Sequence, residues 1–160
     1  GDRLSPARKQ ILKRIISSKN RTWLPEQAPH GSTIIHGDAH FWNFLFDNAE
    51  KSANIRLFDW SSWNIGRSTD DLAYMIGLHW FGERKQLMEE KMLRFYHEQL
   101  LNGGVDYSWD ALQQDYRLST VISLLIPVWQ WQHGINAAVW WGHLERGFQA
   151  FEQWECMHLL

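Results

Sequence analysis

Residues 34–43 read Ile-Ile-His-Gly-Asp-Ala-His-Phe-Trp-Asn, and residues 55–60 read Ile-Arg-Leu-Phe-Asp-Trp. Both segments are rich in β-branched and aromatic residues, and the polar stretch 47–54 between them is typical of a turn. We predict short strands at 33–36, 43–46 and 55–58, with the last two forming a hairpin. That hairpin would bring Asp38, Asn43 and Asp59 together, although they are well separated along the chain.

Carboxylate and amide oxygens in this pattern suit a hard cation such as Mg²⁺. Protein kinases use an Asp, an Asn five residues later and a downstream Asp in this way. The first carboxylate accepts or orients the proton of a substrate hydroxyl. The Asn and the second Asp hold the Mg²⁺ that bridges the phosphates of ATP, and the rate comes mostly from positioning and charge neutralisation.

Three motifs occur in order and at kinase-like spacing: His36-Gly37-Asp38 with Asn43, then Phe58-Asp59-Trp60, then Asp71-Leu72-Ala73. Together they resemble the aminoglycoside phosphotransferase and choline kinase-like family. The helical stretch 96–118, which begins Tyr-His-Glu-Gln-Leu, resembles the ecdysteroid-kinase-like branch of that family. The resemblance covers about residues 30–130 and corresponds to the carboxy-terminal catalytic lobe alone.

The resemblance implies an ATP-dependent phosphotransferase that acts on a hydroxyl of a small molecule. Asp38 resembles the catalytic base, and Asn43 and Asp59 resemble the residues that bind Mg²⁺ and, through it, ATP. His36 and Asp71 resemble residues that support the catalytic loop. The acceptor pocket of such enzymes lies between this loop and the helical region that begins near Tyr74, and either a cationic or a ring-bearing acceptor is compatible with the residues there.

The remainder of the sequence predicts helices and one compact domain. Helices are expected at 5–18, 69–80, 83–101, 136–159 and from Ser108 to about His133, with Ser5 and Ser108 as N-caps and a kink at Pro127. The expected fold class is α+β and mainly helical, a protein-kinase-like carboxy-terminal lobe whose small β-hairpin carries the catalytic loop. Within a single domain 1–160, we expect a leading helix and loop at 1–32, the catalytic-loop strands at 33–60 and a helical bundle at 61–160.

Residues 1–32 contain no Gly-rich loop and no strand–loop–strand pattern. Kinases need such a segment, with its Lys, to grip ATP. We therefore expect the amino-terminal lobe to be absent and the chain to be a fragment or truncated form of a longer enzyme. Alone it should bind Mg·ATP poorly and be inactive, and its partners should be the small-molecule substrate and either the missing lobe or a second copy.

Composition narrows the location and the partners. The 160 residues carry a formal net charge of −2, so no basic field indicates a nucleic-acid partner. No apolar stretch is long enough to span a bilayer. The single cysteine, Cys156, excludes an internal disulfide and fits a reducing, cytoplasmic compartment.

Two other functions remain open at this point. His36, Asp38 and His40 alternate along the chain, a pattern that could bind the metal of a hydrolase. The remaining histidines from residue 79 onward fall in predicted helices without shared spacing, and the hydrolase leaves Asn43 and Asp59 unexplained. A non-catalytic, pseudokinase-like module is the other alternative, favoured by the absent lobe and disfavoured by the intact Asp38, Asn43 and Asp59.

Overall fold

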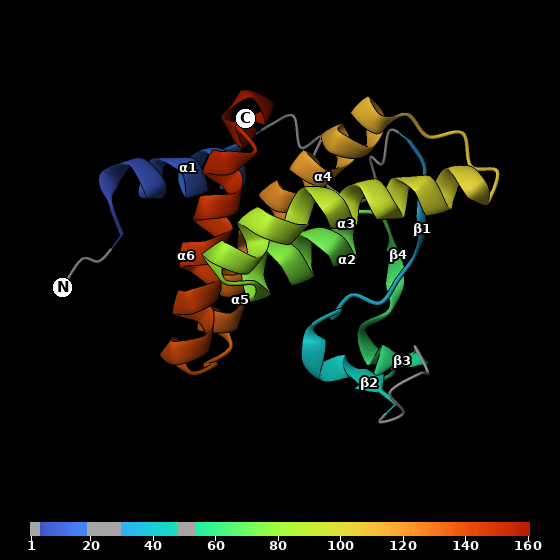
Figure 1. Ribbon diagram of the computed structural model, residues 1–160. Helices are drawn as coiled ribbons and strands as arrows, with labels where there is room; N and C mark the ends of the chain where they lie inside the picture. The colour runs from blue at the N-terminus through green and yellow to red at the C-terminus, as the bar shows by residue number, and fades with distance from the viewer. Residues whose placement is uncertain (1–3, 19–29, 48–53) are drawn as a thin grey trace.

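The computed structural model describes residues 4–18, 30–47 and 54–160 (Figure 1). The chain is mainly helical, with two small antiparallel sheets of two strands each. The strands gather at one end of the molecule, away from α1 (Pro6–Ser17) and α6 (Ala137–Gln153) (Figure 1). This arrangement confirms the predicted mainly helical α+β class and is compatible with a kinase-like lobe.

The strand region contains the predicted hairpin and one strand that was not predicted. Strands β2 (Phe44–Phe46) and β3 (Ile55–Leu57) pair antiparallel, with Leu45 opposite Arg56. The turn expected between them at 47–54 lies largely outside the described residues. Strand β1 (Thr33–Ile35) pairs with β4 (Asn64–Gly66), which sequence reasoning missed because Asn and Gly are poor strand formers.

Helix α1 (Pro6–Ser17) confirms the first predicted helix, and Ser5 caps it by accepting a hydrogen bond from the Arg8 N–H. Helix α3 (Gly82–Asn102) matches the prediction closely. Helix α4 (Trp109–Ser123) begins at its predicted cap, since the Ser108 hydroxyl accepts a hydrogen bond from the Ala111 N–H.

Three predicted helices have different bounds. The helix predicted at 69–80 begins as α2 (Asp70–Leu72) and continues as the wider π-helix η4 (Ala73–His79), which no sequence pattern indicates. The helix predicted to run from Ser108 to His133 is broken, and α5 (Leu125–Gln132) follows α4. Pro127 has no N–H to donate to the Ser123 carbonyl, which explains the break.

The last predicted helix, 136–159, ends early. Helix α6 (Ala137–Gln153) is followed by Glu155, whose φ of 52° is left-handed, and by the short 3₁₀-helix η5 (Cys156–Leu159). A left-handed residue cannot continue an α-helix. The turn carries Cys156 into the core, where it is fully buried.

The main core joins the first and last helices of the chain. Ile11 and Ile15 of α1 pack with Leu118, Phe148 and Cys156 in one buried cluster. Arg8 adds an ion pair of 2.6 Å with Glu145 on α6. Figure 1 shows α1 beside the carboxy-terminal end of the chain, so residues far apart in the sequence form one hydrophobic unit.

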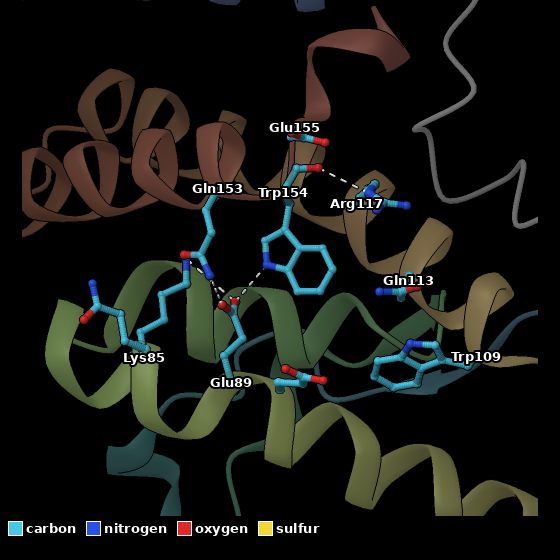
Figure 2. Close-up of a pocket in the computed structure, with 10 residues that line it drawn as sticks. Lys85, Glu89, Trp109, Gln113, Arg117, Gln153, Trp154 and Glu155 are labelled. Carbon is cyan, nitrogen blue, oxygen red and sulfur yellow. Dashed lines mark hydrogen bonds and ion pairs between the residues drawn. The ribbon is translucent and has the colours of Figure 1, made fainter.

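A buried carboxylate, Glu89, joins α3 to α4 and to the end of α6. Its Oε1 accepts hydrogen bonds from the Tyr116 hydroxyl (2.8 Å) and the Trp154 Nε1–H (3.1 Å), and its Oε2 accepts one from Gln153 Nε2 (2.7 Å). Lys85 Nζ lies 3.7 Å from Oε1. Figure 2 shows Glu89 pointing from α3 toward Gln153 and Trp154. Because every neighbour donates, the position requires an acceptor-only side chain.

We therefore predict that Glu89→Gln lowers the free energy of unfolding by about 3 kcal/mol. The NH₂ group of the new amide would face neighbouring groups that are themselves donors, and Lys85 would lose its counter-charge. Denaturant unfolding measures this effect. The matched control is Glu90→Gln at the neighbouring position, whose exposed pair with Arg94 should be worth no more than about 0.5 kcal/mol. Equal effects of the two substitutions would contradict the role assigned to Glu89.

Candidate active site

The loop after β1 is tied to the hairpin by the buried imidazole of His36. Its Nδ1 accepts a hydrogen bond from the Asp38 N–H (3.2 Å), and its Nε2 lies 2.8 Å from the Phe58 carbonyl oxygen. A backbone N–H can only donate, so Nδ1 is the acceptor and Nε2 carries the proton that binds Phe58. His36 thus connects the loop to the residue just before Asp59.

The same loop is held from the helical side by Asp71. Its Oδ2 accepts a hydrogen bond from the His36 N–H (2.7 Å) and its Oδ1 accepts one from the Gly37 N–H (2.9 Å). Gly37 has a φ of +78°, and a Cβ there would collide with the Ser62 carbonyl. The turn therefore requires glycine for two reasons, its left-handed backbone and its lack of space.

Asp38 lies at the edge of this loop with its carboxylate partly exposed. The Tyr74 hydroxyl donates to its Oδ1 (2.8 Å), while Oδ2 has only longer contacts of 3.4 Å, to Asn43 Nδ2 and to His40 Nε2. Burial and the bond to Asp38 raise the pKa of Tyr74 far above its ordinary value of 10, so the phenol remains a donor. Of the two oxygens, Oδ2 is therefore the freer to accept a proton.

Asn43 is buried and oriented by the loop and the hairpin together. Its side-chain Nδ2 donates to the backbone carbonyl oxygen of Asp38 (2.9 Å). Its backbone carbonyl oxygen accepts a hydrogen bond from the Phe58 N–H (3.1 Å). Within the described ranges, its side-chain oxygen Oδ1 has no hydrogen-bond partner. The structure therefore brings Asp38 and Asn43 into direct contact and leaves one amide oxygen available for a ligand.

Asp59 follows Phe58, whose backbone forms hydrogen bonds with both His36 and Asn43. It is exposed, its φ is 58°, and its Oδ1 accepts a hydrogen bond from the Ser61 hydroxyl (2.7 Å). A left-handed backbone is uncommon for a residue other than glycine, and such positions cluster at functional sites. Asp59 makes no direct hydrogen bond to Asp38 or Asn43 and is linked to them through the backbone of Phe58.

A cavity of about 540 Å³ opens beside Asp38, next to the region from Tyr74 onward where an acceptor was expected. Three imidazoles line it in sequence: the ring centroids of His40 and His79 are 5.4 Å apart, and those of His79 and His143 are 4.5 Å apart. Other lining residues include Phe41, Trp42, Tyr74, Phe81, Gln130, Val139 and Arg146.

Two of these imidazoles are held neutral. Burial, followed by the nearby charges of His143, His40 and Arg146, lowers the pKa of His79 from 6.5 to about 3. Burial and Arg146 similarly lower the pKa of His143 to about 4. At neutral pH the cavity wall therefore presents uncharged, polar rings.

Sequence reasoning did not assign Tyr74, His79, His143 or Arg146 to the site. Of these four residues, only His143 and Arg146 have a spacing that places them on one face of a helix, since they are three residues apart. Nothing in the sequence places that face of α6 beside a loop about one hundred positions earlier. Tyr74 follows Asp71 by three residues, but it reaches Asp38 from within the unpredicted π-helix.

The geometry disfavours the hydrolase alternative built on His36, Asp38 and His40. Both ring nitrogens of His36 are used within the fold, and its ring is buried. Among residues 4–18, 30–47 and 54–160, no three His, Cys, Asp or Glu side chains are grouped so that they could hold a metal ion. His40 contacts Asp38 and lines the cavity.

Comparison with known proteins identifies a family for this chain. The model of the ecdysteroid kinase-like family matches residues 2–103, which is more than half of the 160 residues and includes every predicted site residue. No curated protein and no solved structure matches the chain significantly. In the described part of the chain, no helix is both long enough and apolar enough to cross a membrane.

The neutral histidines generate a prediction about acid stability. Between pH 6.5 and about 4, His143 takes up a proton in the unfolded chain but not in the folded one, so stability falls as the pH is lowered through this window. His143→Gln should flatten the dependence by up to about 1.4 kcal/mol per pH unit. Urea unfolding at several pH values measures it, with the exposed His133→Gln as control. An unchanged slope in the His143 variant would contradict the assignment.

Proposed function

The chain belongs to the ecdysteroid kinase-like family, and on that premise we propose that it transfers a phosphoryl group from ATP to a hydroxyl of a small molecule. The main support for the proposal is the hydrogen bond between Asn43 and Asp38. Asp38 lies beside the cavity, Asn43 ends the short 3₁₀-helix η2 (Phe41–Asn43) that follows the loop, and the backbone of Phe58 links Asn43 to the neighbouring Asp59. The family match supports the kinase-like class, and the site residues supply the finer proposal.

Asp38 is proposed as the proton acceptor. Tyr74 fixes Oδ1, so the carboxylate has a defined orientation with Oδ2 toward an incoming hydroxyl. The hydroxyl proton passes to Oδ2 as the hydroxyl oxygen attacks the phosphorus, and ADP leaves. Positioned general bases of this kind contribute about 10² to 10⁴ in rate.

Asn43 and Asp59 are proposed to hold Mg²⁺. Their available groups are an amide oxygen and a carboxylate, which are hard donors that fit this ion. When bound, Mg·ATP supplies the phosphoryl group and neutralises the charge on its phosphates. The buried amide of Asn43 is pre-oriented by its hydrogen bond to the Asp38 backbone carbonyl, and Asp59 is exposed, with a left-handed backbone.

His36 and Asp71 are proposed as supporting residues that do not touch substrate. His36 holds the end of β3 close to the loop, and Asp71 fixes the two N–H groups that precede Asp38. The free, buried Cys156 is consistent with the proposed cytoplasmic location.

We also propose that the strand-side surface is covered by a partner, namely an amino-terminal lobe that grips the nucleotide. Its apolar side chains are exposed: Ile34 and Ile65 face each other across β1 and β4, and their neighbours in the strand region are Leu45, Phe46, Ile55, Trp60 and Trp63. Large exposed apolar patches mark interaction sites. The alternative of a non-catalytic interaction module would use this same surface.

The predicted consequence for this chain alone is self-association. Its mass, measured by light scattering, should rise with concentration, and Ile65→Lys should suppress the rise because a charge would be buried in the contact. The control is Leu87→Lys, which changes an exposed leucine on α3, outside the strand region. A chain that stays monomeric at every concentration, or that responds equally to both substitutions, would contradict the proposed surface.

The function itself is tested by ATP consumption with the protein expressed at its full natural length, over aminoglycosides, choline, sugars and sterols. Asp38→Asn should lower turnover by about a hundredfold or more without changing the melting temperature. Asp106→Asn, which changes an exposed carboxylate away from the cavity, should retain activity. Full activity in the Asp38 variant would rule out the proposed base.

A further inference from the structure

Arg146 projects from α6 into the cavity beside Asp38 without a carboxylate partner. Its Nε donates to the Leu78 carbonyl oxygen, and its guanidinium carbon lies 5.3 Å from the centroid of the Phe81 ring. Among the residues that the structure describes, no Asp or Glu forms an ion pair with it, and its two Nη nitrogens have no hydrogen-bond acceptor. A half-buried guanidinium therefore has donors that the fold does not use.

The surrounding wall contains further polar atoms without hydrogen-bond partners among the described residues. His40 Nδ1 and His79 Nε2 are buried without a hydrogen-bond partner in the described ranges. His79 is 8% exposed, and its ring lies between those of His40 and His143. Buried polar atoms are nearly always satisfied in native proteins, so unsatisfied ones in a cavity wall indicate a missing ligand or water.

The negative and positive charges of the cavity wall lie at different places. Among the described residues, Asp38 is the only carboxylate that lines the cavity, and Tyr74 occupies its Oδ1. The positive charge of Arg146 lies near His79 and His143 instead. The neutral state of both imidazoles is maintained partly by that charge. An anion near Arg146 would be attracted, and a cation would be repelled.

The rest of the lining is apolar, with Phe41, Trp42, Phe81 and Val139 available to contact a hydrophobic body. We propose that the acceptor is an apolar or ring-bearing hydroxy compound with an oxyanionic group, a carboxylate, sulfate or phosphate, that pairs with Arg146. Its hydroxyl lies at Asp38, an assignment that rests on the proposed function. Guanidinium groups bind such oxyanions through two parallel hydrogen bonds.

The test is isothermal titration without nucleotide, using three matched probes: 4-(hydroxymethyl)benzoate, its carboxamide and its trimethylammonium analogue. The series is repeated with sulfate and phosphate esters in place of the carboxylate. The protein should bind at least one oxyanion about tenfold or more tightly than the amide and the cation, the preference expected of a single charge-assisted pair.

Arg146→Gln should abolish this preference, and Arg146→Lys should retain part of it because the charge remains. The matched control is Arg84→Gln, which removes another guanidinium that lies over an aromatic ring, that of Trp80, but does not line the cavity. Melting temperatures establish that the variants are folded. If Arg146→Gln does not fold, the Lys variant and the amide comparison still decide the outcome.

Binding of the amide or the cation as tightly as every oxyanion would overturn the proposal. So would a preference that survives in folded Arg146→Gln, or the absence of saturable binding by any oxyanion of the series. Because no phosphoryl group is transferred in this titration, its result is independent of the Asp38→Asn assay. If the protein prefers oxyanions but transfers no phosphoryl group, the proposed function is wrong and this inference stands. If it phosphorylates only neutral or cationic alcohols, this inference is wrong and the proposed function stands.

Discussion

The two hydrogen bonds that the Asp71 carboxylate accepts from the His36 and Gly37 N–H groups join the strand region to the helical region. Asp71 lies in the first turn of α2, and the loop that it holds carries Asp38. Charge-assisted bonds to two adjacent N–H groups fix a backbone segment more firmly than a single neutral bond. This connection holds the loop that brings Asp38 to Asn43 and to the cavity wall.

From this connection a chain of contacts extends in both directions. Toward the hairpin it passes through His36 and Phe58 to Asn43. Toward the helices it passes from Asp38 to the Tyr74 hydroxyl and to His40, and from His40, ring contacts with His79 and His143 extend to α6. Hydrogen-bond networks are costly when incomplete, so they specify one arrangement of the elements they join. The candidate site is thus built from three parts of the chain, and its cavity exists only when all three are packed together.

The local parts of this structure could be predicted from the sequence. Ser5 and Ser108 cap helices where their patterns indicate, and the strands around the polar turn form the expected hairpin. Strand β4 could not be predicted, because its pairing with β1 compensates for the poor strand propensity of Asn64 and Gly66. The contact of Tyr74 with Asp38 and the place of Arg146 in the cavity wall were missed for a related reason, because a π-helix and the packing of α6 produce them and no sequence period indicates either feature.

We propose that the Asp38 loop, Asn43 and Asp59 form one metal and phosphoryl-transfer centre. A crystal structure of the protein with a non-hydrolysable ATP analogue and Mn²⁺, located by its anomalous signal, tests the claim directly. We expect the ion at about 2.1 Å from Asn43 Oδ1 and from an Asp59 oxygen, the distance typical of an ion of this class. An ion bound by His40 and Asp38, or one that touches neither Asn43 nor Asp59, would contradict it.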